Sequence, residues 1–478
     1  MADRKGADVM EAPNDSFMSS NSDLVIEEPL RSYVNEKKLL LKTDLRVVPI
    51  LFIVYLAAFL DRVNISNALT MGLPAELGLE GQQSNIALCI FFVPYILFEV
   101  PSNVLMKKLN PHVWLSGCIL CFGIIMLCQG FVQSYSGLLA TRFFLGLAEA
   151  GIFPGSFYLI SFWYTKEEAQ KRFTVYWSST ILSGAFGGLL TSAIAEMNHI
   201  RGLSSWRWVF ILEGIATVLI GILAFFCITD FPREAKWLSP EERAFLLKKT
   251  KTDESRVVPV TPKDVLDFLL TPKAWLGAFM YFSVLVTCYS LSYFTPTIIQ
   301  TLGYSTIETQ LHSVPPFAAA FGFAMVLAYL SDKARMRSPF IFLGLALLIT
   351  GLSIVMTTHG SSHFSAEYAG ICLAAMGSFG IGGMIICWYV MNLRGHVERS
   401  IGTAWMIGFG NCGGIVATFL FVKKDAPYYH TGYTVCLSMV CLCVVVCAGY
   451  ALHIWRQKKS IIAGIEKYGD GVDHTLYL

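Results

Sequence analysis

The stretch Phe59-Leu60-Asp61-Arg62-Val63-Asn64-Ile65-Ser66-Asn67 places one acid, one arginine and two asparagines inside an apolar run that begins near Val47. On membrane-insertion scales a charged side chain costs about 2.5–3.5 kcal/mol at the middle of a spanning helix, and less nearer its end. Such groups face a protein interior or a water-filled cavity, and they are candidates for function. We therefore expect this stretch to lie inside a bundle of helices.

A second charged stretch, Arg142-Phe143-Phe144-Leu145-Gly146-Leu147-Ala148-Glu149-Ala150-Gly151, interrupts another apolar run. Arg142 and Glu149 are seven residues apart. Seven steps of about 100° return nearly to the same helix face, about 10 Å further along the axis. Both side chains can therefore point into one cavity, where they could contact Asp61 and Arg62.

The composition is that of a polytopic membrane protein. Of 478 residues, 54% are hydrophobic and only 15% are charged, whereas a soluble protein carries about 25% charged residues. The net charge of +2 gives no indication of nucleic-acid binding. We find no phosphate-binding loop with lysine, no catalytic triad and no zinc-ligand spacing. The sequence thus predicts no enzyme activity, no cofactor and no metal.

Twelve apolar runs are long enough to span a bilayer, which takes about 20 residues. The predicted spans are 47–69, 85–105, 113–132, 138–163, 173–195, 208–228, 273–301, 312–330, 339–358, 368–392, 401–422 and 435–456. Lysine and arginine are concentrated in one alternate set of loops, including the long central one. By the positive-inside rule, that set and both termini are cytosolic.

These spans divide the chain into two six-helix halves. The predicted organisation is a disordered cytosolic tail (1–45), an N-terminal half (46–229), a cytosolic linker (230–272), a C-terminal half (273–456) and a cytosolic tail (457–478). Within the linker, Ser239-Pro240-Glu241-Glu242 is a capping box that predicts a short amphipathic helix. Basic clusters after the second and eighth spans suggest a repeat, which is typical of transporters whose halves rock around a central site.

The motifs resemble the major facilitator superfamily and, within it, the anion:cation symporters. The resemblance covers about 43–456 and rests on Leu60-Asp61-Arg62-Val63-Asn64-Ile65 and on Arg142-x-x-x-Gly146-x-x-Glu149-Ala150-Gly151-x-x-Pro154-Gly155. Phe294-x-Pro296-x-Ile298-Ile299 and Ile407-Gly408-Phe409-Gly410-Asn411-x-Gly413-Gly414 resemble the fungal allantoate and nicotinate permease branch. Pro101-Ser102-Asn103 departs from the superfamily's common glycine- and aspartate-rich motif after the second span. The symporter branch usually shows this degenerate form.

The charged residues suggest a division of roles. Arginine offers a planar, permanently charged fork for a carboxylate, so Arg62 is our candidate clamp for an anionic substrate. Glu149 is the candidate proton carrier, with Asp61 as a supporting carboxylate, and Arg142 would hold either acid or form part of an outer gate. The resemblance implies the same roles for these four positions. The alternative is a buried salt-bridge network that only fixes helix packing.

Polar and aromatic residues at cavity depth complete the predicted substrate site: Tyr95, Tyr293, Trp388, Asn392 and Asn411. An amide within the bilayer needs a partner, which makes Asn411 the candidate of the C-terminal half. Each of these residues could instead serve helix packing.

We therefore expect an all-α membrane protein of the major facilitator fold that carries a small organic anion, such as nicotinate or allantoate, together with a proton. We expect it to work as a monomer in the lipid bilayer of the plasma membrane. Two alternatives remain: an exporter of an acidic secondary metabolite and a substrate sensor that has lost transport.

Overall fold

Each regular element that the computed structural model describes is a helix. The described residues are 34–250, 261–334, 336–358 and 364–462. The longer helices are α3 (Glu36–Thr70), α6 (Phe92–Lys108), α7 (Pro111–Gln129), α8 (Tyr135–Glu149), α9 (Ile152–Trp163), α10 (Lys166–Ala195), α11 (Ser205–Cys227), α14 (Pro272–Thr301), α16 (Val314–Ala334), α17 (Ser338–Thr357), α18 (Phe364–Met391), α19 (Gly395–Thr418) and α20 (His430–Ile462).

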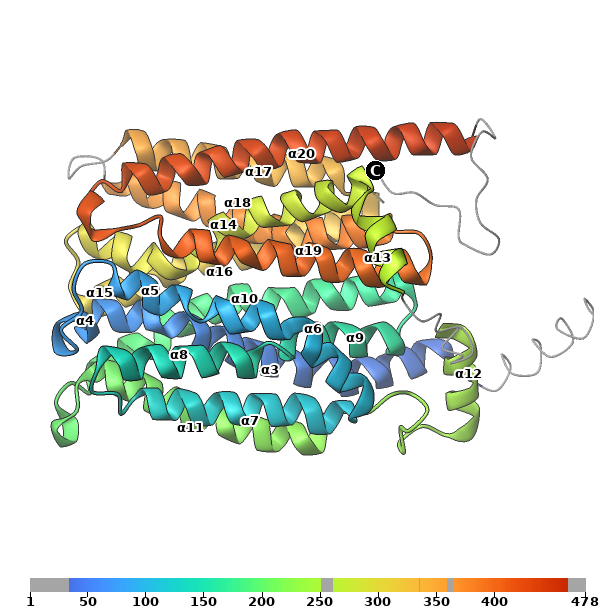
Figure 1. Ribbon diagram of the computed structural model, residues 1–478, viewed down its shortest axis with the longest axis horizontal. Helices are drawn as coiled ribbons and strands as arrows, with labels where there is room; N and C mark the ends of the chain where they lie inside the picture. The colour runs from blue at the N-terminus through green and yellow to red at the C-terminus, as the bar shows by residue number, and fades with distance from the viewer. Residues whose placement is uncertain (1–33, 251–260, 335, 359–363, 463–478) are drawn as a thin grey trace, which may run out of the picture.

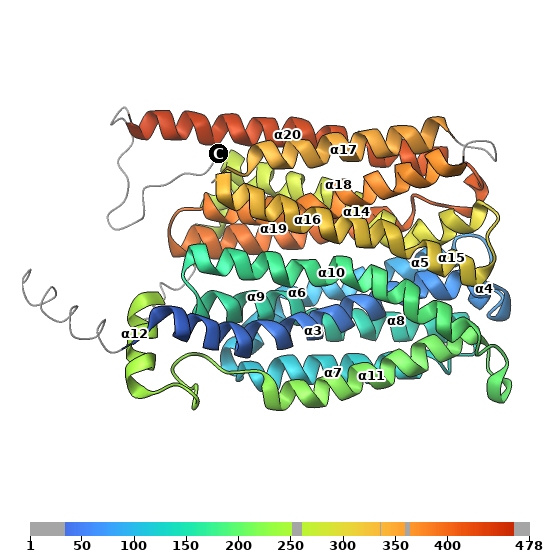
Figure 2. The ribbon, with the colours of Figure 1, turned by 180° about the vertical axis from the view of Figure 1, so that it is seen from behind.

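The long helices run roughly side by side in two groups (Figure 1). One group holds α3 to α11 and the other holds α14 to α20. The groups meet where α10 packs on α16, α3 on α14 and α6 on α19, and the contact between α10 and α16 is visible from behind (Figure 2). We call the end where α3 begins and α20 ends the terminal end, and the other, with α4 (Leu73–Glu76) and α15 (Thr306–His312), the opposite end.

The helices reproduce the twelve predicted spans, although several are longer than predicted. The first begins at Glu36 instead of Val47, within the stretch predicted to be tail, and Asn35 caps it by accepting a hydrogen bond from the Lys38 amide at 3.1 Å. Hydropathy detects only the apolar part of a helix, whereas this helix continues beyond that part. Residues 1–33 and 463–478, which make up most of the predicted tails (1–45 and 457–478), lie outside the described residues.

Two predicted spans are broken by proline. Pro94 and Pro154 each lie four residues after a break, at Ile90 and Ala150. A proline ring clashes with the carbonyl four residues before it and donates no hydrogen bond there. The second span is therefore α5 (Gln83–Cys89) followed by α6, and the fourth is α8 followed by α9. The short helix α15 precedes the eighth span, which is α16.

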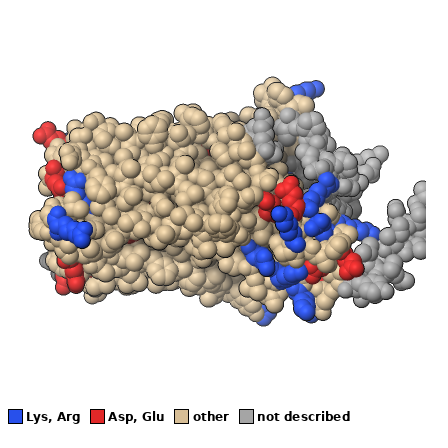
Figure 3. Space-filling view, turned by 90° about the horizontal axis from the view of Figure 1, so that it is seen from below, with Lys and Arg blue, Asp and Glu red and all other residues tan. Residues whose placement is uncertain are grey.

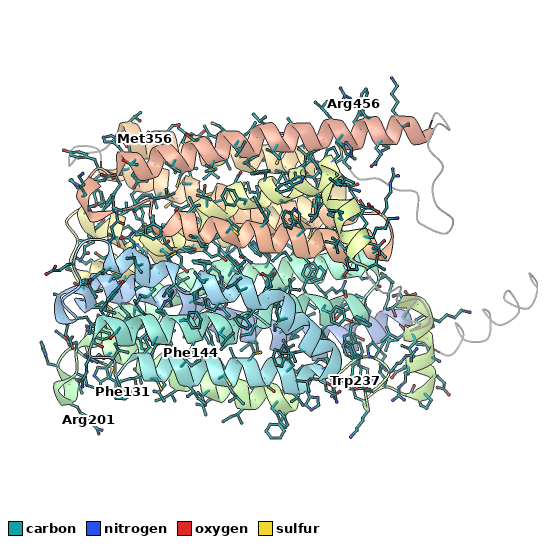
Figure 4. The ribbon with its side chains drawn as sticks, viewed as in Figure 1. Phe131, Phe144, Arg201, Trp237, Met356 and Arg456 are labelled. Carbon is teal, nitrogen blue, oxygen red and sulfur yellow. The ribbon has the colours of Figure 1, made fainter. Side chains whose placement is uncertain are left out.

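A broad band without surface charge separates the two ends of the molecule. Lysine and arginine gather at the terminal end, and a smaller mixed group of charges lies at the opposite end (Figure 3). Among the described helices, eleven are long and apolar enough to cross a membrane. The twelfth, α19, lies alongside α14. Large apolar side chains are exposed on the band, for example Phe144 at 53% (Figure 4).

The linker contains the predicted short helix, α12 (Pro240–Thr250), whose capping box is formed between Ser239 and Glu242. Glu242 also accepts from Lys42 of α3 at 2.7 Å, and Lys249 donates to Glu168 of α10 at 2.6 Å. These contacts hold α12 across the terminal end. A second linker helix, α13 (Pro262–Leu269), was not predicted, although Thr261 and Asp264 form its capping box.

Candidate functional site

Arg62 is fully buried and reaches from the first half to a residue of the second, Tyr289. Its Nε donates to both carboxylate oxygens of Glu149, each at 3.1 Å, and its Nη2 also contacts Glu149. The helix break at Ala150–Gly151 follows Glu149 directly, so the carboxylate sits at the end of α8. Transporter sites are commonly built at such discontinuities within the bilayer. The two charges predicted from separate apolar runs thus form one buried ion pair.

A chain of hydrogen bonds leads from this ion pair to the other half. Arg62 Nη1 donates to the hydroxyl of Tyr289 on α14 at 2.8 Å, and that hydroxyl donates to Asn411 Oδ1 on α19 at 3.2 Å. Asn411 Nδ2 then donates to Glu99 Oε2 on α6 at 3.3 Å. The chain therefore starts at the cation, crosses into the C-terminal half and returns to an acid of the N-terminal half.

Aromatic rings enclose the guanidinium of Arg62. Its central carbon lies 4.8 Å from the ring centre of Tyr95 and 5.1 Å from those of Phe59 and Phe91. A cation that has left water is stabilised by ring faces at this distance. The rings also keep water away, which strengthens the attraction between Arg62 and any carboxylate.

Arg142 has a different set of partners from those predicted. Its Nε donates to the carbonyl of Ala87 and its Nη1 to the carbonyl of Arg62, each at 3.3 Å, and its guanidinium lies 5.0 Å from the ring of Phe91. Among the described residues it forms no ion pair with Asp61 or Glu149. The structure therefore places Arg142 as a brace between α3, α5 and α8.

Asp61 points away from Arg62 and towards α11, because successive side chains on a helix are turned by about 100°. Thr217 donates to Asp61 Oδ2 at 2.7 Å. One turn further along α3, Asn64 donates to Glu213. Residues of the first charged stretch therefore lie in two environments. Arg62 belongs to the ion pair with Glu149, and Asp61 lies with Glu213 between α3 and α11.

A narrow pocket lies beside the ion pair, between the two halves. Its lining residues are Tyr55, Phe59, Tyr95, Phe153, Trp177, Thr180, Tyr281, Leu285, Cys288, Tyr289, Phe379, Ile407 and Asn411. Eight of these thirteen side chains are aromatic, so the walls favour a flat, apolar body. Tyr95 and Tyr289 both line the pocket and contact Arg62, so a ligand there is separated from the cation by one layer of side chains.

The predicted substrate residues fall into two sets. Tyr95 and Asn411 line the pocket, and Tyr293 stacks on Tyr289 with ring centres 6.1 Å apart. Trp388 and Asn392 do not line this pocket. Trp388 packs edge-on against Tyr450 of α20 at 4.8 Å, and the Asn392 carbonyl accepts from Lys273 at 2.5 Å. Trp388 lies on α18 and Asn392 directly follows it, and the sequence alone could not orient either side chain. Their role in substrate binding stays a prediction.

Two buried acids that contact predicted site or span residues, Glu99 with Asn411 and Glu213 with Asn64, were missed. They are 4% and 5% exposed. Each is a lone acid in an apolar run, Ile96-Leu97-Phe98-Glu99-Val100 and Ile211-Leu212-Glu213-Gly214-Ile215, and that isolation was the available signal. Within the described residues, no group of three or more histidines, cysteines or acids could hold a metal ion.

Side-chain contacts join the halves at the opposite end. Asn85 donates to the carbonyl of Thr418 at 2.5 Å, and Gln310 of α15 donates to Thr70 of α3 at 2.9 Å. Thr191 of α10 donates to the same Gln310 at 3.1 Å. These bonds connect three helices of the first half with two of the second at this end.

Comparison with known proteins shows which family the chain belongs to. Residues 51–422 match the family model described as Major Facilitator Superfamily. The chain is 32% identical over 457 residues to the MFS transporter prlL of a fungal species, covering 92% of each chain. It is 30% identical over 434 residues to the major facilitator-type transporter hxnP of Emericella nidulans, covering 89% of this chain and 86% of that one.

The fold also matches a crystal structure of a bacterial homologue of the human lysosomal transporter Spinster, in an inward-facing and unoccupied conformation. The TM-score is 0.64 at 17% identity, over 89% of this chain and 97% of that one. This likeness supports the fold alone. The family match over residues 51–422 and the 32% identity to prlL show that the chain is a multi-pass membrane protein of the major facilitator superfamily.

Proposed function

We propose that this chain carries a small organic anion together with a proton, by alternating access. The observation that carries the proposal is the position of Arg62, which is fully buried, held by Glu149 and bonded across the interface to Tyr289. A cation at this depth is costly unless it is paired. Arg62 is paired with Glu149, and protonation of Glu149 would remove the negative charge of this partner.

Competition for Arg62 is the proposed coupling. In the structure the Glu149 carboxylate occupies the Nε and Nη2 side of the guanidinium. Protonation of Glu149 removes its negative charge and frees that side for the carboxylate of a substrate. Removing one partner of a buried ion pair costs about 3–5 kcal/mol, so neither the proton nor the anion is expected to bind strongly without the other.

The pocket favours a substrate with a flat ring and a carboxylate. Its aromatic walls match a ring, and the carboxylate would reach Arg62 through the layer formed by Tyr95 and Tyr289. Among the acids considered, nicotinate fits this description best, and allantoate and dicarboxylates fit it less well. The described residues of one chain supply all of these groups, which supports a functional monomer.

Orientation follows from charge. The lysines and arginines that gather at the terminal end support a cytosolic location for that end and for both termini (Figure 3). The hydrogen bonds at the opposite end would then close the external side, and the halves would rock to open it. We expect the membrane to be the plasma membrane, with uptake driven by acid outside.

Uptake into proteoliposomes tests the proposal. The purified chain is reconstituted and offered nicotinate, allantoate, pantothenate or a dicarboxylate, with and without a pH gradient. We expect nicotinate to accumulate when the external side is acidic, and collapse of the gradient with a protonophore to release it. Equal uptake with and without the gradient would rule out proton coupling. Binding without any transport would instead support the sensor, and acid-driven extrusion would support the exporter.

A further inference from the structure

Glu99 is a buried acid that the competition between Glu149 and substrate does not use. It lies on α6, is 4% exposed and accepts one hydrogen bond, at 3.3 Å, from the neutral amide of Asn411. The titratable groups that interact with it electrostatically come from four helices: Arg62 of α3, Tyr95 of α6, Tyr281 of α14 and Cys412 of α19. Arg62 is the only cation among these, and its own direct carboxylate partner is Glu149.

The hydrogen-bond chain has one direction, and Glu99 is its final acceptor. Arg62 donates to Tyr289, Tyr289 donates to Asn411, and Asn411 donates to Glu99. Arg62 is thus placed between two acids, Glu149 by direct contact and Glu99 through two neutral groups. A change in the charge of Glu99 is therefore transmitted to the same guanidinium that would bind the substrate.

The contact that ends the chain also joins the two halves. Glu99 belongs to α6 in the first group of helices, and Asn411 belongs to α19 in the second. A buried carboxylate whose one bonded donor is neutral is strongly disfavoured, so burial favours the protonated acid. When the halves separate at this contact, water reaches the carboxyl group and favours its ionised form. The proton affinity of Glu99 therefore depends on the conformational state, as coupling requires.

We propose that Glu99 is a second proton-binding site, filled while α6 and α19 are in contact and emptied when they separate. The proposal rests on the proposed function, because it adds a second proton to the same transport cycle. A purely packing role predicts otherwise: a glutamine at this position keeps the acceptor oxygen for Asn411 and would leave the number of transported protons unchanged.

Infrared spectroscopy of the purified full-length chain tests the titration without any substrate. Acid-minus-alkaline difference spectra are recorded for wild type, Glu99→Gln and the matched control Glu367→Gln, which removes another buried acid, 1% exposed, at the opposite end. We expect Glu99→Gln to lose one component of the carboxylic C=O band and Glu367→Gln to retain it. Identical spectra for wild type and Glu99→Gln would show that Glu99 does not titrate, and the proposal would fail.

Accumulation at zero membrane potential then counts the coupled protons. With two protons per substrate, one unit of pH gradient supports about 100-fold accumulation of nicotinate, and with one proton about 10-fold. We expect about 100-fold for wild type and Glu367→Gln, and about 10-fold for Glu99→Gln. Equal accumulation by wild type and Glu99→Gln would overturn the proposal, as would about 10-fold accumulation by wild type. Wild type without proton-driven uptake would instead refute the proposed function, and the infrared result would still decide whether Glu99 titrates.

Discussion

Replacing Arg62 by alanine is expected to weaken substrate binding by about two orders of magnitude. A carboxylate that displaces Glu149 would accept from Nε and Nη2, the two donors that face Glu149. Each hydrogen bond to a charged group contributes about 1.5–3 kcal/mol, so two contribute at least about 3 kcal/mol. That free energy corresponds to a factor of about 150 in the apparent dissociation constant.

Arg62→Lys separates charge from geometry. Lysine keeps the positive charge but lacks the planar fork. We expect it to lose about one hydrogen bond and to bind roughly tenfold more weakly than wild type. Arg201→Ala is the matched control, since Arg201 is an exposed arginine at the opposite end (Figure 4), and this variant should bind substrate normally.

The assay is the concentration dependence of initial uptake in proteoliposomes, using the acid that wild type transports best. Thermal unfolding in detergent shows whether each variant is folded. If folded Arg62→Ala transports with unchanged apparent affinity, Arg62 is not the carboxylate clamp. If Arg62→Lys equals wild type, charge alone is sufficient and the argument from the guanidinium fork is wrong.

Three further predictions concern the surrounding structure. Tyr289→Phe removes the bridge between Arg62 and Asn411, so we expect slower transport and about 1–3 kcal/mol lower stability in unfolding measurements. Gly146→Val should lower the melting temperature, because a Cβ there would lie 2.1 Å from the Phe91 carbonyl oxygen, whereas Gly117→Val, with no atom within 4 Å, should not. Burial raises the pKa of Glu76, but hydrogen bonds from Ser204, Trp206 and Arg207 outweigh it and hold the pKa below 4.5. Wild type should therefore be more stable than Glu76→Gln above pH 4.5, and melting curves at falling pH should show this advantage disappearing as Glu76 becomes protonated.

The fold could be predicted largely from hydropathy. Twelve apolar runs gave twelve spans, because a helix is the only way for an isolated segment to satisfy its backbone in lipid. Helix ends were less predictable, since α3 and α20 continue into polar sequence that hydropathy does not score. The breaks at Ile90 and Ala150 could have been read from Pro94 and Pro154, four residues later in each case.

The site could be predicted only in part. Arg62 and Glu149 stood out because each is a charge in an apolar run, and they form one ion pair. The direction of a side chain around its helix was not predictable without knowing the neighbouring helices. For that reason the sequence did not reveal that Asp61 turns towards α11 or that Trp388 faces α20.

The chain of donors from Arg62 to Glu99 was beyond sequence analysis for a further reason. It joins residues up to 312 positions apart, and it depends on how the two halves dock. Asn411 was identified as a polar group within the bilayer that needs a partner. Which partner it finds follows from the packing of α19 on α6.

Glu149→Gln tests the central claim most directly. Glutamine keeps the size of the side chain and cannot carry a proton as the acid does. In one set of proteoliposomes, two quantities are measured: accumulation of the substrate driven by a pH gradient, and exchange of labelled for unlabelled substrate without a gradient. We predict that Glu149→Gln loses the accumulation coupled to Glu149 and retains exchange, because binding at Arg62 persists while the proton that competes with substrate is gone. At most the about 10-fold accumulation that a proton on Glu99 supports per unit of pH gradient would remain. Accumulation by Glu149→Gln equal to that of wild type would contradict the account.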